Sequence, residues 1–350
     1  MKMWLLYRRT QARRVFGPCL LLLAFAFSGF TQSPDDVSSI LDSAVAHARS
    51  RSLYRDKVDW QREIPEIRLR AKDARRVEDL APALNYLLSR LEDTHGRFLL
   101  NGKPIAYYFD EPTENQKKID LNVWASIQSR SYPFKAELFE GHLGYIRLPG
   151  MPMGDNLQMS KEIRNAVCQV ADRGAKKWIV DLRYNGGGNM YPMMQGIAEL
   201  IGNGVIGYVV DRNGRKLSTW SIRESDFYYD EYRAVDLDRG CLSADDPKVA
   251  VLISQYTASS GEAVAVTFKG RPKTRFFGLD TAGLVTVTDW TQLGGDLIAS
   301  ISIGYYSDRK STVYQSYISP DNKIDFQITN DPEKDEILKA AIEWLRQKGQ

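Results

Sequence analysis

Histidine, cysteine and long apolar runs are scarce in this chain of 350 residues, and each scarcity limits the kinds of functional site that the chain can form. Its three histidines, His47, His95 and His142, stand far apart in the sequence, and no His-Glu-x-x-His occurs, so metal catalysis has no support. A Gly-x-Gly-x-x-Gly occurs at Gly202 to Gly207, but it lies between an expected helix and an expected strand and does not open a helix. No phosphate-binding loop is present, so a nucleotide cofactor is disfavoured. We therefore expect the chain to act without a cofactor or a metal.

An excess of charge of either sign is also absent. Five of the 47 basic residues precede Asp35, the first acidic residue, and the other 42 face 44 acidic residues, a net charge of about −2. A chain with this balance lacks the basic surface that nucleic-acid binding needs, so no nucleic-acid partner is expected. Its length suffices for a full α/β core and a smaller second unit.

The basic N-terminus precedes an apolar segment, residues 15–27, that is too short to span a bilayer comfortably. Because Ala26-Phe27-Ser28 places small residues where a signal peptidase cleaves, we expect residues 1–28 to be a secretory signal. An uncleaved anchor, which would associate the protein with the membrane, is the alternative. Cys19 lies at the start of the apolar segment, which argues against a lipoprotein signal. The mature chain is expected to be exported, periplasmic or secreted.

Two cysteines, Cys168 and Cys241, remain in the mature chain. They can form a disulfide in an oxidising compartment, but two cysteines are not a framework, so both the paired and the reduced states stay open. Neither has the surroundings of a nucleophile.

Residues 35–96 follow a helical period and predict a small N-terminal helical domain. Its apolar positions fall into three groups. They are Val37, Ile40, Leu41, Ala44 and Val45, then Ile64, Ile67 and Leu69, then Leu80, Leu84, Leu87, Leu88 and Leu91.

Residues 97–350 predict one core domain of mixed α/β character. Strands over 135–139, 142–148 and 178–182 alternate with helices over 155–174 and 190–201, an order that indicates a sheet with parallel members covered by helices. A hairpin over 205–210 and 216–222, with Asn213-Gly214 at its turn, is followed by a long polar loop, 223–247. Further strands are expected over 275–278, 284–289, 297–306 and 312–318, and a last helix over 332–348, capped by Asp331.

A serine pair stands at the centre of this core, in Tyr256-Thr257-Ala258-Ser259-Ser260-Gly261-Glu262. The unbroken apolar run 249–253 before it predicts a buried strand, and helical spacing follows it up to Gly270. A serine where a strand becomes a helix suits nucleophilic catalysis, because free amides at a helix N-terminus stabilise negative charge. The alternative is a serine that only caps the helix.

A serine nucleophile needs a base, and His95 is the histidine best placed to supply one. It stands in Glu92-Asp93-Thr94-His95-Gly96, where the last N-terminal helix stops, so its ring can project beyond the helix. A histidine stabilised by the helix dipole is the alternative. His47, within a helical stripe, is most simply a surface residue, and His142 enters a strand at a turn.

A run of glycines follows one of the buried strands, in Asp181-Leu182-Arg183-Tyr184-Asn185-Gly186-Gly187-Gly188. Consecutive glycines let backbone amides approach a ligand closely, as an oxyanion hole requires. A tight strand-to-helix turn would use the same residues.

These motifs together resemble the C-terminal-processing, or tail-specific, serine peptidases, and within them the PDZ-less Ser-His branch that includes tricorn-like peptidases and the nisin resistance protein. Asp93-Thr94-His95 is similar to the Asp-Gly-His of that branch, and Asp181 to Gly188 to the family's Asp-Leu-Arg-x-Asn-x-Gly-Gly. The serine stretch is similar to Thr-Ala-Ser-x-x-Glu, and Pro320-Asp321 to a late Pro-Asp. The resemblance implies a crotonase-like, tail-specific-protease-like core, a mixed β-sheet flanked by helices and preceded by the helical domain.

The resemblance also implies roles for individual residues. Its nucleophile is the serine three residues before the glutamate, which selects Ser259 over Ser260. The amides of Gly187 and Ser260 would form the oxyanion hole. The lysine base of the larger branch is replaced here by Leu284, so His95 must serve. Glu262 and Thr94 are possible supporting residues, Glu262 for the turn and Thr94 for the imidazole.

The chain departs from the family in two places. Tyr314 stands where tricorn-like members place the glutamate of their triad, and residues 97–139 are too few for a PDZ domain. No Gly-x-Ser-x-Gly occurs, and the Ser-x-x-Lys at Ser307 to Lys310 lies in a charged link with no helix to present it.

We therefore expect an exported serine peptidase that cleaves peptides or proteins near their C-termini by a Ser-His mechanism. The acidic and aromatic loop 223–247 suggests a cationic peptide as substrate. The alternative is a catalytically inactive peptide- or ligand-binding protein on the same fold, because the acid at Tyr314 is missing.

Overall fold

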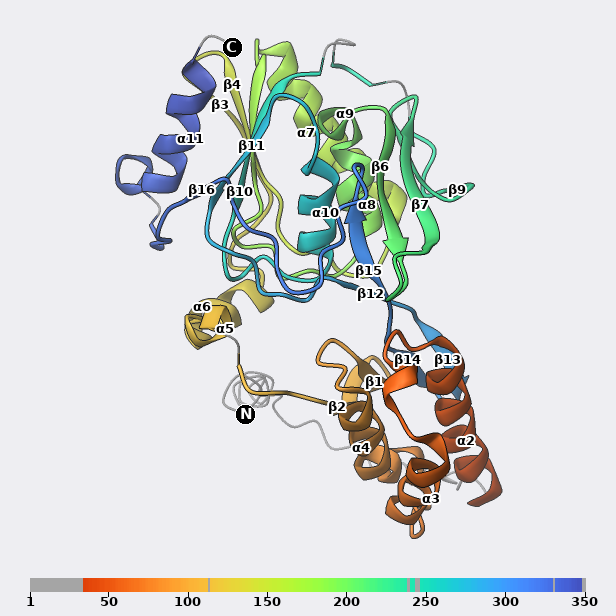
Figure 1. Cartoon of the computed structure of the whole chain (residues 1–350). Coiled ribbons are helices and arrows are strands. Elements are labelled where there is room, and N and C mark those ends of the chain that lie inside the picture. Colours follow the sequence, from red (N-terminus) through yellow and green to blue (C-terminus); the bar gives the residue numbers. More distant parts are fainter. Residues whose placement is uncertain (1–33, 113, 238–239, 243–245, 330, 348–350) are drawn as a thin grey trace, which may run out of the picture. The chain divides into compact units, whose positions relative to one another are not determined.

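The computed structural model describes residues 34–112, 114–237, 240–242, 246–329 and 331–347 (Figure 1). It divides into two compact units, each made of two pieces of the chain. The first unit holds the chain up to Glu111 together with Thr288–Ile303, and the second holds Pro112–Val287 and the chain from Gly304 onward. The expected signal, residues 1–28, lies outside the described residues. None of the helices in the described part is both long and apolar enough to cross a membrane.

The first unit contains the three expected helical elements, and a small sheet covers them. The helices are α2 (Pro34–Arg51), α3 (Trp60–Arg70) and α4 (Ala81–Leu91), with short 3₁₀ turns η1 (Arg55–Lys57) and η2 (Val77–Leu80) between them. The stripes of α2 and α4 are buried in one core, together with Ile67 of α3. Leu69 is different, because 55% of it is exposed.

The sheet of the first unit makes the domain boundary differ from the one expected at residue 96. Its strand order is β13-β14-β1-β2, with β1 (Arg97–Leu100), β2 (Lys103–Tyr107), β13 (Thr291–Gly294) and β14 (Leu297–Ser300). β1 pairs antiparallel with β14, Arg97 opposite Ser300. Local periodicity cannot reveal a pairing between segments about 200 residues apart, so the sequence alone does not assign these segments to the first unit.

The second unit is built on a six-stranded mixed sheet, as the alternation of strands and helices predicts. Its order is β16 (Asn322–Lys323), β11 (Thr274–Gly278), β10 (Lys248–Ile253), β5 (Lys177–Asp181), β4 (Leu143–Arg147) and β3 (Lys135–Phe139). The pairs from β16 to β4 are parallel, and β3 is antiparallel to β4. β4, β5 and β10 are buried on both faces, which explains their nearly unbroken apolar runs.

Helices cover both faces of this sheet (Figure 1). The C-terminal helix α11 (Glu336–Arg346) packs its apolar side against β5, β10 and β11. Helices α7 (Asn156–Asp172), α8 (Met190–Gly196) and α10 (Ser260–Phe268) pack together with the strands, and α10 contacts both β10 and the second sheet. α11 is shorter than the helix expected over 332–348, because a 3₁₀ turn, η3 (Pro332–Lys334), precedes it and Asp335 is its cap.

A second six-stranded sheet has the order β12-β15-β6-β7-β8-β9. Its strands are β12 (Thr286–Thr288), β15 (Ser302–Asp308), β6 (Gly204–Val210), β7 (Lys216–Arg223), β8 (Asp226–Tyr229) and β9 (Tyr232–Arg233). The hairpin of β6 and β7 confirms the prediction from Asn213-Gly214. The prediction of a polar loop over 223–247 is partly wrong, because β8 and β9 lie in this range and extend the same sheet.

Two strand predictions near the C-terminus are also wrong. The strand expected over 297–306 is two strands, β14 and β15, which belong to different sheets. The strand expected over 312–318 makes only a single bridge, between Ser307 and Val313. Its backbone donors bond elsewhere, since the amide of Thr312 donates to the Asp308 carboxylate and that of Ile318 to the Thr281 hydroxyl.

Cys168 and Cys241 form a disulfide in the second unit, with their Cα atoms 5.4 Å apart. The bond ties α7 to the segment that follows β9. The Glu199 carboxylate, in the short helix α9 (Ala198–Ile201), accepts hydrogen bonds from the amides of Cys241 and Leu242 and so holds the same segment. This settles the alternative that the sequence left open in favour of the paired state.

Reducing the disulfide is expected to lower the free energy of unfolding by about 4 kcal/mol, because it closes a loop with a sequence separation of 73 residues and restricts the unfolded chain. Chemical denaturation with and without dithiothreitol measures the effect, and a Cys168→Ser, Cys241→Ser double variant should match the reduced protein. Identical midpoints for the oxidised and reduced protein would contradict the expectation.

Candidate active site

Ser259 lies at the turn between β10 and α10 in a conformation that an ordinary helix cap does not have. Its φ is 53° and its ψ is −118°. A capping serine normally has β-region angles, and a non-glycine residue held at positive φ costs roughly 1–3 kcal/mol. A sharp, strained strand-to-helix turn is how α/β-hydrolases expose a nucleophilic serine. The conformation of Ser259 therefore favours a nucleophile over a simple cap.

The buried carboxylate of Glu262 holds this turn in place. One oxygen accepts the amide hydrogens of Ser259 and Leu284 at 2.9 and 2.8 Å, and the other accepts from the Thr281 hydroxyl and the Gly283 amide. Burial raises the pKa of Glu262 to about 7, although these four donors favour the ionised form. Glu262 thus joins the serine turn to the loop 281–284.

The glycine loop lies directly beside the two serines. A Cβ atom added to Gly187 would lie 2.8 Å from the Ser259 Cβ and 3.3 Å from the Ser260 nitrogen, and the φ of Gly187 is +99°, so only glycine suits the position. The Ala258 amide donates to the Asn185 carbonyl at 2.9 Å and links the two motifs. The structure therefore brings together Ser259, Ser260 and Gly187.

The hydrogen bonds of this loop distinguish the two serines and the two amides. The Ser260 hydroxyl donates to the Gly188 carbonyl at 2.6 Å, so it fixes the loop. The Ser260 amide is the first of α10, a position with no intrahelical acceptor. The Gly187 amide donates to the Asn185 side chain at 3.0 Å. An oxyanion at Gly187 would compete with Asn185 for that hydrogen.

A buried ion network supports the strand end that leads into the glycine loop. Arg183 lies between Asp181 and Asp335, at 2.8 Å from each, and the Tyr145 hydroxyl also donates to Asp181. Burial opposes ionisation of Asp181, yet the Arg183 guanidinium holds its pKa below the usual range. Sequence reasoning missed Asp335 as a partner of Arg183, because 152 residues separate the two. The signal that could have drawn attention to Asp335 is its position as the cap of α11.

His95 lies in the first unit, between α4 and β1, and is half-buried. The fully buried carboxylate of Asp93 organises its turn, accepting the amides of His95 and Gly96 and both the amide and hydroxyl of Ser302. Burial raises the pKa of Asp93. Thr94 contributes its backbone carbonyl, which accepts a hydrogen bond from Arg97. His95 belongs to the first unit and Ser259 to the second.

The other two histidines have different surroundings. His47 was expected at the surface, but only 11% of its side chain is exposed and its Nε2 lies 3.1 Å from Asp289. The reason is that β13 and the residues before it return to cover α2. The ring of His142 is exposed and its Nδ1 lies 2.8 Å from the Glu140 carbonyl.

Tyr314, which stands where related enzymes carry a glutamate, donates its hydroxyl to Asp308 at 2.9 Å. Burial raises the pKa of the Tyr314 hydroxyl, so it remains a donor. The acids of the segment after β7 are largely paired as well, Asp226 and Asp236 with Arg233, and Glu231 with Arg223. The negative surface expected there for a cationic peptide is therefore reduced by its own arginines.

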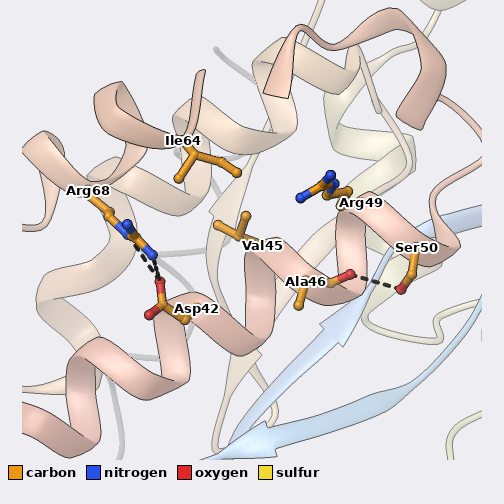
Figure 2. A pocket seen from close by; sticks show the side chains of 7 residues that line it. All are labelled: Asp42, Val45, Ala46, Arg49, Ser50, Ile64 and Arg68. Atoms are coloured by element: carbon orange, nitrogen blue, oxygen red, sulfur yellow. Dashed lines mark hydrogen bonds and ion pairs between the residues drawn. The ribbon is translucent and has the colours of Figure 1, made fainter. Parts of the chain in front are cut away.

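Two of the hollows in the described residues differ in size and place. One of about 490 Å³ lies in the first unit between α2 and α3, and Arg68 and Asp42, which form an ion pair, are among the residues that line it (Figure 2). The other, of about 150 Å³, lies in the second unit beside residues 186–188 of the glycine loop. A cluster of possible metal ligands, Cys168, Glu199 and Cys241, has both sulfur atoms in the disulfide.

Comparison with known proteins places the chain in a family. Residues 142–324 match peptidase family S41. The nisin-resistance protein of Lactococcus lactis subsp. lactis is 29% identical over 182 residues, which are 48% of this chain and 49% of that protein. The chain thus spans about half the length of this curated relative.

Solved structures share the fold at low identity. A lipoprotein from Streptococcus agalactiae superposes with a TM-score of 0.68 at 20% identity, covering 91% of this chain and 99% of that one. The photosystem II D1 C-terminal processing protease superposes with a TM-score of 0.54 at 16% identity, covering 87% and 97%. The expected mixed α/β fold and the resemblance to C-terminal-processing peptidases are confirmed. The family match covers more than half of the sequence, and the chain therefore belongs to peptidase family S41, a family of serine-type peptidases.

Proposed function

We propose that this peptidase hydrolyses peptide bonds near the C-termini of peptides or proteins, with Ser259 as nucleophile and His95 as general base. The observation that carries the proposal is the strained turn at Ser259, which Glu262 holds in place and which lies beside a glycine loop. A binding protein has no need for a serine in a costly conformation beside close backbone amides.

In the proposed reaction the Ser259 Oγ attacks the carbon of the scissile carbonyl and its proton passes to the His95 imidazole. The negative charge that develops on the carbonyl oxygen is stabilised by the amides of Ser260 and Gly187. His95 then gives the proton to the leaving amine as the C–N bond breaks. Water, activated by the same imidazole, hydrolyses the acyl-enzyme and restores Ser259.

The two amide donors of the proposed oxyanion hole differ in whether they already donate a hydrogen bond. The Ser260 amide heads α10, whereas the Gly187 amide donates to Asn185. A charged oxygen is a stronger acceptor than a neutral side-chain amide, so it gains the Gly187 hydrogen when charge develops. This difference favours the transition state over the bound substrate.

We also propose that the protein acts outside the cytosol. The pattern of residues 1–28 is that of a secretory signal, and the Cys168–Cys241 disulfide is typical of an oxidising compartment. N-terminal sequencing of the protein from fractionated cells tests this, since an intact N-terminus in the cytosolic fraction would refute it.

The function is tested on the wild-type protein with a fluorophosphonate probe and a peptide library. We expect the probe to label one serine, mapped by mass spectrometry to Ser259, and the library to show cleavage close to free C-termini. Heat-unfolded protein, which lacks the assembled turn, is the control and should not be labelled. A folded protein that takes no label and cleaves nothing would support the inactive binding protein instead, in line with Tyr314 at the position of the glutamate.

A further inference from the structure

The hollow beside the glycine loop is formed by the short helix α6 (Leu121–Gln128) and the residues just after it. Ile127, Gln128 and Arg130 line one side, and residues 150–151 and 186–188 line the other. The volume, about 150 Å³, is well below the roughly 300–1,000 Å³ of pockets for drug-sized ligands. The hollow therefore suits one end or one side chain of a peptide.

Helix α6 is fixed to both catalytic motifs. Val123 and Ile127 pack in one buried cluster with Tyr184 and Tyr256, the residues that flank the glycine loop and the serine turn. The Tyr256 hydroxyl accepts the amide of Asp120, the cap of α6. The hollow is thus part of the same rigid surroundings as Ser259, within the second unit.

Arg130 is the charged side chain that lines this hollow, and the other lining residues are neutral. In the described part of the chain its guanidinium has no acidic partner, in contrast to Arg183, Arg223 and Arg233. The φ of Arg130 is 59°, an uncommon value for a non-glycine residue, where the chain turns after α6. A positive charge at the edge of a small neutral hollow attracts a carboxylate.

We propose that this hollow is a subsite for a substrate carboxylate, with Arg130 as the residue that selects it. The inference rests on the proposed function and names its substrate class, a peptide that carries a negative charge close to the scissile bond. Because Gly187 both lines the hollow and contacts Ser259, the carboxylate and the reacting carbonyl lie within one or two residues of each other. The carboxylate is either the chain terminus or an acidic side chain.

The test measures binding to the Ser259→Ala protein, so that it needs no turnover. Acetylated tetra-alanine is titrated by calorimetry as the free acid and as the C-terminal amide. We expect the free acid to bind about tenfold more tightly, the effect of one charge-assisted hydrogen bond at a partly exposed site, and less so at high salt. Adding Arg130→Gln should make the two affinities equal, and Arg130→Lys should keep part of the preference.

The matched control is Arg173→Gln, a change of an exposed arginine at the end of α7, away from the lining residues. It should leave the preference unchanged. A second peptide pair, amidated and ending in glutamate or glutamine, separates a side-chain carboxylate from a chain terminus. Equal affinities in the Ser259→Ala protein, a preference that survives Arg130→Gln in a folded variant, or no measurable binding of any acid would overturn the proposal.

Different experimental results would contradict the proposed subsite and the proposed function. A protein that discriminates between acid and amide but takes no fluorophosphonate label has the subsite without the reaction. Cleavage that ignores both the terminal carboxylate and Arg130 has the reaction without the subsite.

Discussion

The Ser259→Ala variant, the His95→Ala variant and the double variant are expected to lose peptide hydrolysis to the same extent, roughly 10⁴-fold or more in kcat. Residues that act as one unit in a reaction are strongly non-additive, because neither the nucleophile nor the base works without the other. The comparison tests whether the two residues act as one catalytic pair. The measurement is kcat on a peptide found in the library, together with the rate of fluorophosphonate labelling.

Ser260→Ala is the control for the first prediction. The Ser260 hydroxyl donates to the Gly188 carbonyl, so its loss loosens the glycine loop but leaves the Ser259 hydroxyl in place. We expect about a tenfold loss of kcat, equivalent to one hydrogen bond. If instead the two losses for Ser259→Ala and His95→Ala multiply in the double variant, the residues act independently and His95 is not the base.

Replacing Glu262 by glutamine is expected to lower kcat by roughly 100-fold with little change in KM, because a small displacement of the nucleophile is costly. The new NH₂ group would face two donors, either the amides of Ser259 and Leu284 or the Thr281 hydroxyl and the Gly283 amide. Each buried donor left without an acceptor costs about 1–3 kcal/mol, so the free energy of unfolding falls as well. Steady-state kinetics and urea denaturation measure the two effects.

Thr281→Val is the matched control, since it removes one of the four donors to Glu262 and leaves the carboxylate and the other three. It also removes the acceptor of the Ile318 amide, so its effect on stability should be about 1–3 kcal/mol. Its effect on kcat should be small. A glutamine variant with the kcat of the wild type would show that Glu262 supports the fold alone.

Glu262 also predicts how stability depends on pH. Burial raises its pKa from 4.5 to about 7 in the folded protein. Between these two pH values the folded state keeps a proton that the unfolded chain has released. The stabilisation that this proton gives the folded state is fully present below pH 4.5 and is lost as pH rises through 7, by up to about 3 kcal/mol. The glutamine variant does not titrate there. As the pH rises from 5 to 8, the free energy of unfolding of the wild type should therefore fall relative to that of the variant.

Local patterns predicted much of the second unit. Apolar runs identified β5 and β10, and the Asn213-Gly214 turn identified the hairpin of β6 and β7, because these signals lie within one element and its turn. The family resemblance brought the glycine loop and the serine stretch together, and the structure places Gly187 beside Ser259.

Contacts between distant segments could not be predicted in the same way. The turn at Ser259 is held through Glu262, and three of the four donors to that carboxylate lie on the loop 281–284. The Arg183–Asp335 pair and the hollow under α6 likewise form only when remote segments meet. Alternation in sequence gives the faces of a strand but not its partner, which is why the sequence predicts β14 and β15 as one strand.

The Asp93–Ser302 bonds have a consequence for the order in which the protein matures. The turn that presents His95 is secured by a residue 209 positions later, and β1 next to it pairs with β14. A chain that emerges from its N-terminus can fold the helices early, but it cannot fix this turn until residue 302 has appeared. If His95 is the base, a chain that ends before residue 302 lacks the contacts that hold this base in its turn.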